Sequence, residues 1–375
     1  MPPIQPMTKE SPVICAASSS NYSRLSSLDI LRGFDLFLLV FLQPVAISVL
    51  AHFDTGWARS VMYQLDHEVW VGFRFWDLIM PLFLFMVGTS MPFSFAKYVG
   101  REGRKTACRH VARRFAILFL LGMLVQGNVL AYSLSEITIY TNTLQAIAAG
   151  YLIAAILILQ FERRGQLIAT LMLLLAYSLP MSIHGDFSRE GNLAYIVDEA
   201  ILGGFRGDTS YTWILSTLTF AVTVMLGVFA GQIIRCGRKN PAAVTRKLVI
   251  IGLTLLLSAW GWSYETPIIK RIWTGSMTLL SGGYCYLLMA LFFYLVDYRG
   301  WSRGLNWLKI YGMNAITAYI LGEIISFRSI VESLTWGLER YMGREWYATF
   351  LTFGNFLILF FILRYMYRRK IFLKI

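Results

Sequence analysis

Charged residues are scarce in this sequence. Only 15% of its 375 residues are Asp, Glu, Lys or Arg, whereas 57% are hydrophobic and the mean hydropathy is +0.57. A soluble domain typically contains about 25% charged residues, so the composition excludes an ordinary soluble globular protein. The apolar residues are gathered into blocks of roughly 18 to 22, which is the length that a helix needs to cross the hydrocarbon core of a bilayer.

Metal-ligand patterns and targeting signals are also lacking. The four cysteines and four histidines form no C-x-x-C pair and no histidine cluster, so we expect no metal site. The N-terminal stretch has no basic start followed by an apolar core, so no signal peptide is predicted. We expect residues 1–23 to be a disordered cytoplasmic tail, followed by one transmembrane domain over residues 24–375.

The apolar blocks predict an all-α polytopic membrane bundle of about ten transmembrane helices. The predicted spans are 31–51, 76–96, 114–132, 143–161, 166–183, 212–234, 248–264, 276–296, 310–327 and 346–363.

The distribution of charge orients these spans. Of the 34 Lys and Arg residues, 25 fall in segments on the side of the N-terminus, whereas 15 of the 21 acidic residues fall on the opposite side. Because basic residues gather on the cytoplasmic side of membrane proteins, both termini are predicted to be cytoplasmic. The basic net charge of +13 therefore reflects topology, and no nucleic-acid partner is expected.

Two basic segments on the cytoplasmic side are candidates for binding an anionic cofactor. Asp29 lies in the first turn of the first span, and Arg32 follows it on the same helix face. The pair is either a structural ion pair at the interface or part of the cofactor site. Arg113 and Arg114 close the dense basic loop 97–114, and ionised donors of this kind form strong hydrogen bonds to phosphate.

His67 is the candidate catalytic residue. It alone among the four histidines has carboxylates on both sides, Asp66 and Glu68. Histidine exchanges protons near neutral pH, as a general base must; the alternative is a solvated loop histidine. Ten residues later, Asp77 lies at the mouth of span 76–96, where an ionisable group is unfavourable unless it is paired or hydrated.

These segments resemble the family of the lysosomal heparan-alpha-glucosaminide N-acetyltransferase and its bacterial relatives, from Arg24 to about residue 325. The matching motifs are R-L-x-S-L-D-x-x-R-G at 24–33, H-x-x-W-x-G-x-x-x-x-D-L-x-x-P at 67–81, K-x-x-W-T-x-S at 270–276 and G-M-N at 312–314. The histidine element followed by D-L-x-x-P is the specific part, because the opening motif also recurs in other membrane acyltransferases.

The resemblance implies transfer of an acetyl group from cytoplasmic acetyl-CoA to an extracytoplasmic amino sugar or glycan, in a bacterial cytoplasmic membrane. It identifies His67 as the active histidine, acting as a base or as an acyl carrier. Gln43 takes the place of a supporting asparagine, as an oxyanion donor or as a partner of the imidazole, and Asp77 is grouped with these two. The candidate substrate-binding residues are Trp70, Lys270, Trp273 and Asn314. For the two tryptophans, an ordinary interfacial position is the alternative.

Several alternatives stay open. Ala146 stands where many relatives have arginine, and Ser210–Trp213 replace an acidic stretch, so the acceptor is undetermined. The oligomeric state is also open, with a homodimer as one option. The main rival function is a transporter of sugars, lipids or drugs, because polar residues near the midplane of ten spans would suit that task too. A scaffold without chemistry is the third reading.

Overall fold

The computed structural model describes residues 25–373, so the predicted tail, 1–23, lies outside the described residues. This part of the chain contains helices and no strands. The α-helices are α1 (Ser26–Phe37), α2 (Gln43–Leu50), α3 (Gly56–Gln64), α4 (Ile79–Gln126), α5 (Thr143–Gln160), α6 (Arg163–His184), α7 (Leu193–Leu202), α8 (Thr217–Gly237), α9 (Pro241–Trp262), α10 (Gly275–Phe292), α11 (Lys309–Met313), α12 (Ala315–Ile324), α13 (Arg328–Thr335), α14 (Glu339–Met342) and α15 (Arg344–Arg368). The π segments are η1 (Leu38–Leu42) and η5 (Phe293–Tyr298), and the 3-10 segments are η2 (Phe75–Leu78), η3 (Val129–Ala131), η4 (Gly203–Arg206), η6 (Arg303–Leu308) and η7 (Trp336–Leu338).

Eight helices of the described chain are long and apolar enough to cross a membrane, which confirms an all-α polytopic membrane protein. This number differs from the predicted number of about ten, and a shorter apolar helix, Ala315–Ile324, is present in addition. The eight are Ser26–Leu50, Phe75–Phe95, Thr143–Gln160, Arg163–His184, Thr217–Gly237, Pro241–Trp262, Gly275–Tyr298 and Arg344–Arg368.

The two missing spans have separate physical causes. The predicted span 114–132 is the end of α4, which kinks at Gly103 (φ 80°) and stops at Gln126 after basic first turns that shorten its apolar stretch. The predicted span 310–327 is interrupted at Asn314 and becomes α11 and α12. At about 1.5 Å rise per residue, the ten residues of α12 cover only about half of the hydrocarbon core.

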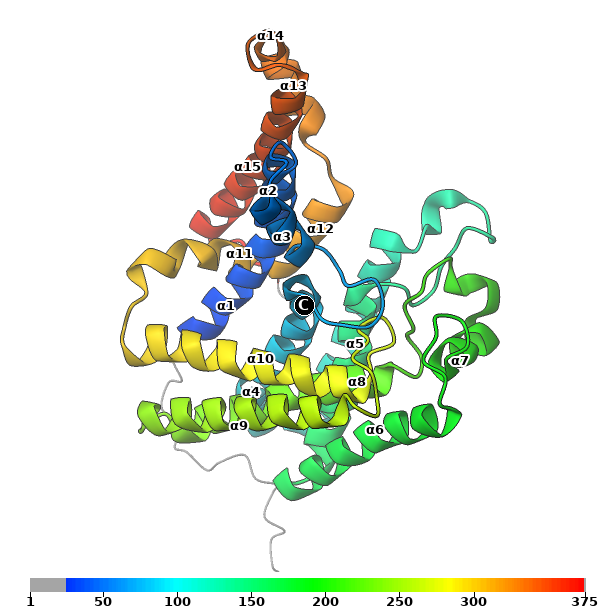
Figure 1. Cartoon of the computed structure of the whole chain (residues 1–375). Helices are drawn as coiled ribbons and strands as arrows, with labels where there is room; N and C mark the ends of the chain where they lie inside the picture. The colour runs from blue at the N-terminus through cyan, green and yellow to red at the C-terminus, as the bar shows by residue number, and fades with distance from the viewer. Residues whose placement is uncertain (1–24, 374–375) are drawn as a thin grey trace, which may run out of the picture.

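The central pair of the bundle is α4 and α8, which pack closely along their lengths. Their backbones meet at Gly88 and Gly227, where a Cβ on either glycine would lie 1.9 Å from a backbone oxygen of the other helix. Helices α9 and α10 run side by side across the same unit (Figure 1). Small residues thus let the helices approach, as is common where lipid provides no hydrophobic drive for association.

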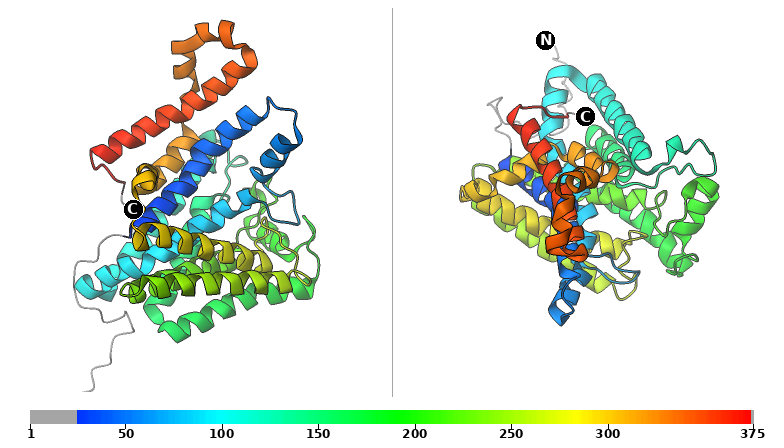
Figure 2. Two further views of the ribbon diagram at one scale, coloured as in Figure 1. Left: turned by 60° about the vertical axis from the view of Figure 1, so that its left-hand side comes forward. Right: turned by 90° about the horizontal axis from the view of Figure 1, so that it is seen from above.

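A second group of helices completes the bundle. Helix α1 packs on α11, and α15 packs on α2 and α11. In Figures 1 and 2, α13 and α14 extend beyond the end of this group. The loop before α4 and the loop before α10 meet through a hydrogen bond between Gly72 and Ile268, and they carry the candidate residues His67 and Lys270.

Candidate active site

Asp77 anchors the loop that precedes α4. Its side chain is completely buried. One carboxylate oxygen, Oδ2, accepts hydrogen bonds from the backbone N–H groups of Arg74 (2.9 Å) and Glu68 (3.2 Å). The other, Oδ1, lies 2.9 Å from Nδ1 of His67. Asp77 therefore fixes both the loop and the histidine that the loop presents.

An ion pair reinforces the same loop. The buried guanidinium of Arg74 binds both carboxylate oxygens of Glu68, at 2.9 and 3.1 Å, and stacks 3.7 Å from the ring centre of Tyr63. The hydrogen bonds from Arg74 lower the pKa of Glu68. The sequence analysis does not identify Arg74. A signal was available, because Arg74 lies between Glu68 and Asp77 in a predicted extracytoplasmic segment, where basic residues are few.

The loop between α9 and α10 brings Lys270 to this site. The N–H of Gly72 donates to the carbonyl of Ile268 at 2.9 Å and so ties the two loops together. Gly72 has φ +134°, and a Cβ there would lie 3.1 Å from Cγ of Glu68, so the tie requires glycine. Thr274 caps α10 and donates to the carbonyl of Pro267 at 2.9 Å, which closes the loop.

His67, Asp77 and Lys270 form one cluster. The Nζ atom of Lys270 lies 2.9 Å from Nδ1 of His67, 3.5 Å from its Nε2 and 3.5 Å from Oδ1 of Asp77. Burial lowers the pKa of Lys270 to about 8, against the opposing attraction of Asp77. Burial also lowers the pKa of His67 more than the hydrogen bond to Asp77 raises it, and the positive charge of Lys270 adds to the lowering.

The two contacts at Nδ1 of His67 compete. A single ring nitrogen cannot donate to Asp77 and accept from Lys270 at once, so two arrangements exist. With Nδ1–H donated to Asp77, Nε2 keeps its lone pair and can accept a proton. With Nδ1 accepting from Lys270, the proton of the neutral ring sits on Nε2. Only the first arrangement makes Nε2 a base.

The cluster lies at one end of a cavity of about 660 Å³. One face of α4 lines this cavity over three turns, and at about 1.5 Å rise per residue this face is roughly 16 Å long. The cavity-lining residues of α4 on this face are Ile79, Met80, Phe83, Val87 and Ser90. Lining residues from α5 and α12 close the other sides, and Thr209, Tyr211 and Glu323 add polar groups.

Two guanidinium groups, Arg32 and Arg114, also line the cavity. Nη2 of Arg32 lies 3.4 Å from the carbonyl of Met86, more than two turns along α4 from Asp77. Arg114 stacks 4.5 Å from the ring centre of Tyr151, and its buried Nε has no hydrogen-bond partner among the described residues. The cavity therefore has one end with two guanidinium groups and one end with the His67 cluster.

The structure brings together five of the predicted site residues in this cavity or at its edge: His67, Asp77, Lys270, Arg32 and Arg114. The remaining six lie elsewhere among the described residues. Gln43 Nε2 donates to the carbonyl of Leu65 at 3.2 Å, and Trp70 Nε1 donates to the carbonyl of Phe187 at 2.8 Å. Arg113 is exposed, whereas Asp29, Trp273 and Asn314 are buried without lining the cavity.

Comparison with known proteins agrees with these motifs. A family model described as the catalytic part of heparan-alpha-glucosaminide N-acetyltransferase matches residues 24–258. The heparan-alpha-glucosaminide N-acetyltransferase of Homo sapiens is 23% identical over 420 residues, which cover 94% of this chain and 60% of that protein. The mouse (Mus musculus) protein is 22% identical over 369 residues, covering 82% and 54%. The chain thus spans a little over half the length of the curated relatives that it matches. His67 and Asp77 fall inside the part that the family model matches, residues 24–258, and Lys270 lies beyond that part.

Proposed function

Because the chain belongs to the heparan-alpha-glucosaminide N-acetyltransferase catalytic family, we propose that it transfers an acetyl group from cytoplasmic acetyl-CoA to an amino sugar or glycan on the far side of the membrane. The observation that carries this proposal is the division of the cavity. The cluster of His67, Asp77 and Lys270 lies at one end, and Arg32 and Arg114 lie along the other part.

The guanidinium groups suit the phosphates of the acetyl donor. Both Arg32 and Arg114 line the cavity, and the buried Nε–H group of Arg114 has no acceptor among the described residues. Ionised donors to phosphate form strong, often bidentate, hydrogen bonds. The apolar face of α4 between the two ends would accommodate an extended thioester arm, with the acetyl group at His67.

Proton transfer is the task of His67. The acceptor's nitrogen or oxygen forms a bond to the acetyl carbon, the C–S bond breaks, and the acceptor's proton passes to Nε2 of His67. The departing thiolate then takes up that proton. Asp77 keeps Nδ1–H donated to itself, so that Nε2 stays a base, and a positioned base of this kind contributes typically ~100- to 10,000-fold. An acetyl-histidine intermediate on Nε2 would use the same residues.

We infer that Lys270 fills the oxyanion-donor role that the resemblance suggests for Gln43. It lies at the cavity and against His67, so its ammonium can stabilise the negative charge that develops on the acyl oxygen. It also holds the pKa of His67 down, which keeps the imidazole neutral. Gln43 instead supports the segment before His67 through the carbonyl of Leu65.

Transfer across the membrane can be tested in sealed vesicles. Purified protein is reconstituted in liposomes loaded with glucosamine and other amino sugars, and acetyl-CoA labelled in its acetyl group is added outside. We expect labelled product trapped in the lumen, and none in protein-free vesicles. Label that enters the lumen as free acetate, or product formed only when donor and acceptor share one compartment, would contradict the proposal.

A further inference from the structure

A second cavity of about 470 Å³ lies away from the active site and shares no lining residue with it. Its lining comes from the start of α6, the end of α8 and the start of α9. Helix α8 packs against both α6 and α9, which make no extensive contact with each other over the described residues. The cavity is therefore a groove between α6 and α9 whose floor is α8.

The two helices that flank this groove are largely exposed. Helices α6 and α9 are the least buried of the eight candidate spans, with 28% and 22% of their apolar windows buried. Ile250, on the wall of the groove, is 55% exposed, and Ile233 and Ile251 line it as well. Apolar walls of this kind suit an acyl chain, and the helix ends place the mouth of the groove at a membrane surface.

The mouth of the groove is cationic. Arg163 and Lys247 line it, and no carboxylate does among the residues described. Neither side chain is ion-paired within that part of the chain. Basic pockets between helices on the cytoplasmic side commonly bind anionic lipid head groups, and each cation near the surface contributes about 1 kcal/mol.

Gln232 adds a buried acceptor to the groove lining. Its Nε2 donates to Oε1 of Gln166 at 2.8 Å, while its own Oε1 is buried and has no hydrogen-bond partner among the described residues. A buried acceptor without a partner is unfavourable. A ligand with both a phosphate and a hydroxyl group would therefore satisfy the two cations and this oxygen together.

We propose that this groove binds an anionic phospholipid with a hydroxylated head group, of the phosphatidylglycerol type, in the cytoplasmic leaflet. The phosphate contacts Arg163 and Lys247, a head-group hydroxyl donates to Oε1 of Gln232, and one acyl chain lies against Ile250. The site anchors the α6–α8–α9 side of the bundle and is independent of the acetyl-transfer site.

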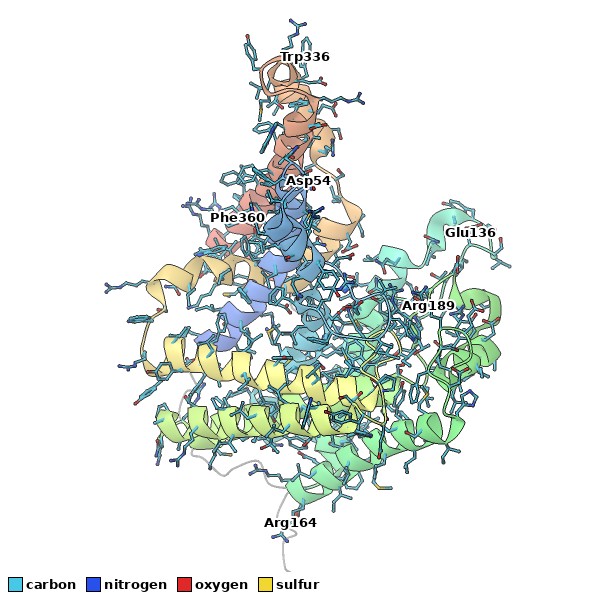
Figure 3. The ribbon with its side chains drawn as sticks, in the orientation of Figure 1. Asp54, Glu136, Arg164, Arg189, Trp336 and Phe360 are labelled. Atoms are coloured by element: carbon cyan, nitrogen blue, oxygen red, sulfur yellow. The ribbon has the colours of Figure 1, made fainter. Side chains whose placement is uncertain are left out.

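The test uses the full chain in neutral detergent, with phosphatidylglycerol binding measured by native mass spectrometry and by the lipid-induced shift in melting temperature. Arg163→Ala with Lys247→Ala should weaken binding roughly 30-fold, from about 1 kcal/mol per cation. The matched control is Arg164→Ala with Arg246→Ala, two exposed neighbours outside the groove. Arg164 extends away from the bundle at the start of α6 (Figure 3).

The head-group hydroxyl has its own test. The parent protein should bind phosphatidylglycerol about fivefold more tightly than phosphatidylmethanol, which has no hydroxyl, and Gln232→Leu should abolish this difference. Should the double groove variant fail to fold, Lys247→Gln alone keeps the charge test in place.

Three results would overturn the proposal. Equal losses in the groove and control variants would mean that only general surface charge acts. Equal binding of phosphatidylglycerol and phosphatidylcholine would mean that the groove is not selective for anionic lipid. Displacement of the lipid by millimolar inorganic phosphate would mean that the groove is a free-phosphate site.

Discussion

Replacing Asp77 with asparagine isolates its effect on the tautomer of His67. The two backbone N–H groups at 2.9 and 3.2 Å require an acceptor at the position of Oδ2, so the asparagine oxygen must occupy that position. Its NH₂ group then faces Nδ1 of His67 and donates to it. The imidazole is held with its proton on Nε2, and Nε2 can no longer accept the proton of the acceptor.

The expected loss in kcat follows from this change of tautomer. Where an aspartate orients a catalytic histidine in serine proteases, the same substitution lowers kcat about 10⁴-fold. The side chain of His67 is 36% exposed, so its ring is less confined and a smaller loss is expected. We predict that Asp77→Asn lowers kcat by about 10²- to 10³-fold, measured as release of free CoA thiol with an amino-sugar acceptor.

Asp66→Asn is the matched control. Asp66 also contacts His67, but it accepts the backbone N–H at 2.7 Å and its side chain is 72% exposed. We expect its kcat to stay within about threefold of the parent. If Asp77→Asn were folded and also stayed within tenfold of the parent, the tautomer argument would be refuted.

A second consequence of Asp77→Asn can be measured without an acetyl acceptor. Without the carboxylate that raises it, the pKa of Lys270 falls further below its already lowered value of about 8. The pKa of lysine in the unfolded chain is about 10.4. In the variant, the unfolded chain therefore binds more protons than the folded protein over a wider pH range, and the free energy of unfolding increases with pH in that range. The melting temperature of Asp77→Asn should therefore fall further behind the parent at pH 6 than at pH 9.

Three other substitutions distinguish the remaining roles. Lys270→Met should lower kcat about 10²- to 10³-fold, because an oxyanion donor is lost. The kcat of the parent protein should also decline above pH about 8, where Lys270 loses its proton, and a pH profile that is flat to pH 10 would contradict this role. Arg114→Gln should weaken acetyl-CoA binding about tenfold in calorimetric titration, whereas Arg113→Gln, outside the cavity, should not; equal effects would argue against specific phosphate contacts. Gln43→Ala should cost less than tenfold in kcat and about 1 kcal/mol in stability by removing the hydrogen bond to Leu65; a loss above 100-fold would restore Gln43 as an oxyanion donor.

Local spacing in the sequence was enough to predict part of this site. His67 and Asp77 are ten residues apart in one motif, and the structure joins them at 2.9 Å. The pairing of Lys270 with His67 spans 203 positions and depends on the hydrogen bond between Gly72 and Ile268. No pattern within either loop specifies that tie, so the lysine could be suggested only by the resemblance, as a substrate-binding residue.

Sequence patterns also predicted only part of the fold. Hydropathy predicted a helical membrane protein, because a helix of about 20 apolar residues spans the hydrocarbon core and forms all its backbone hydrogen bonds internally. The ten predicted spans do not all correspond to long helices, because a hydropathy window cannot detect the interruption at Asn314 or the kink at Gly103. Both are features of the backbone conformation, which an average over side-chain hydropathy does not describe.

The central claim is that His67 carries the proton or the acyl group during transfer, and its most direct test is kcat of His67→Ala. We predict a loss of at least about 10²-fold with unchanged acetyl-CoA affinity and melting temperature. The matched control is His184→Ala, an exposed histidine whose Nε2 lies 2.7 Å from the carbonyl of Gly191, and its kcat should equal that of the parent. A His67→Ala protein that turns over acetyl-CoA and acceptor at the parent rate would contradict the account.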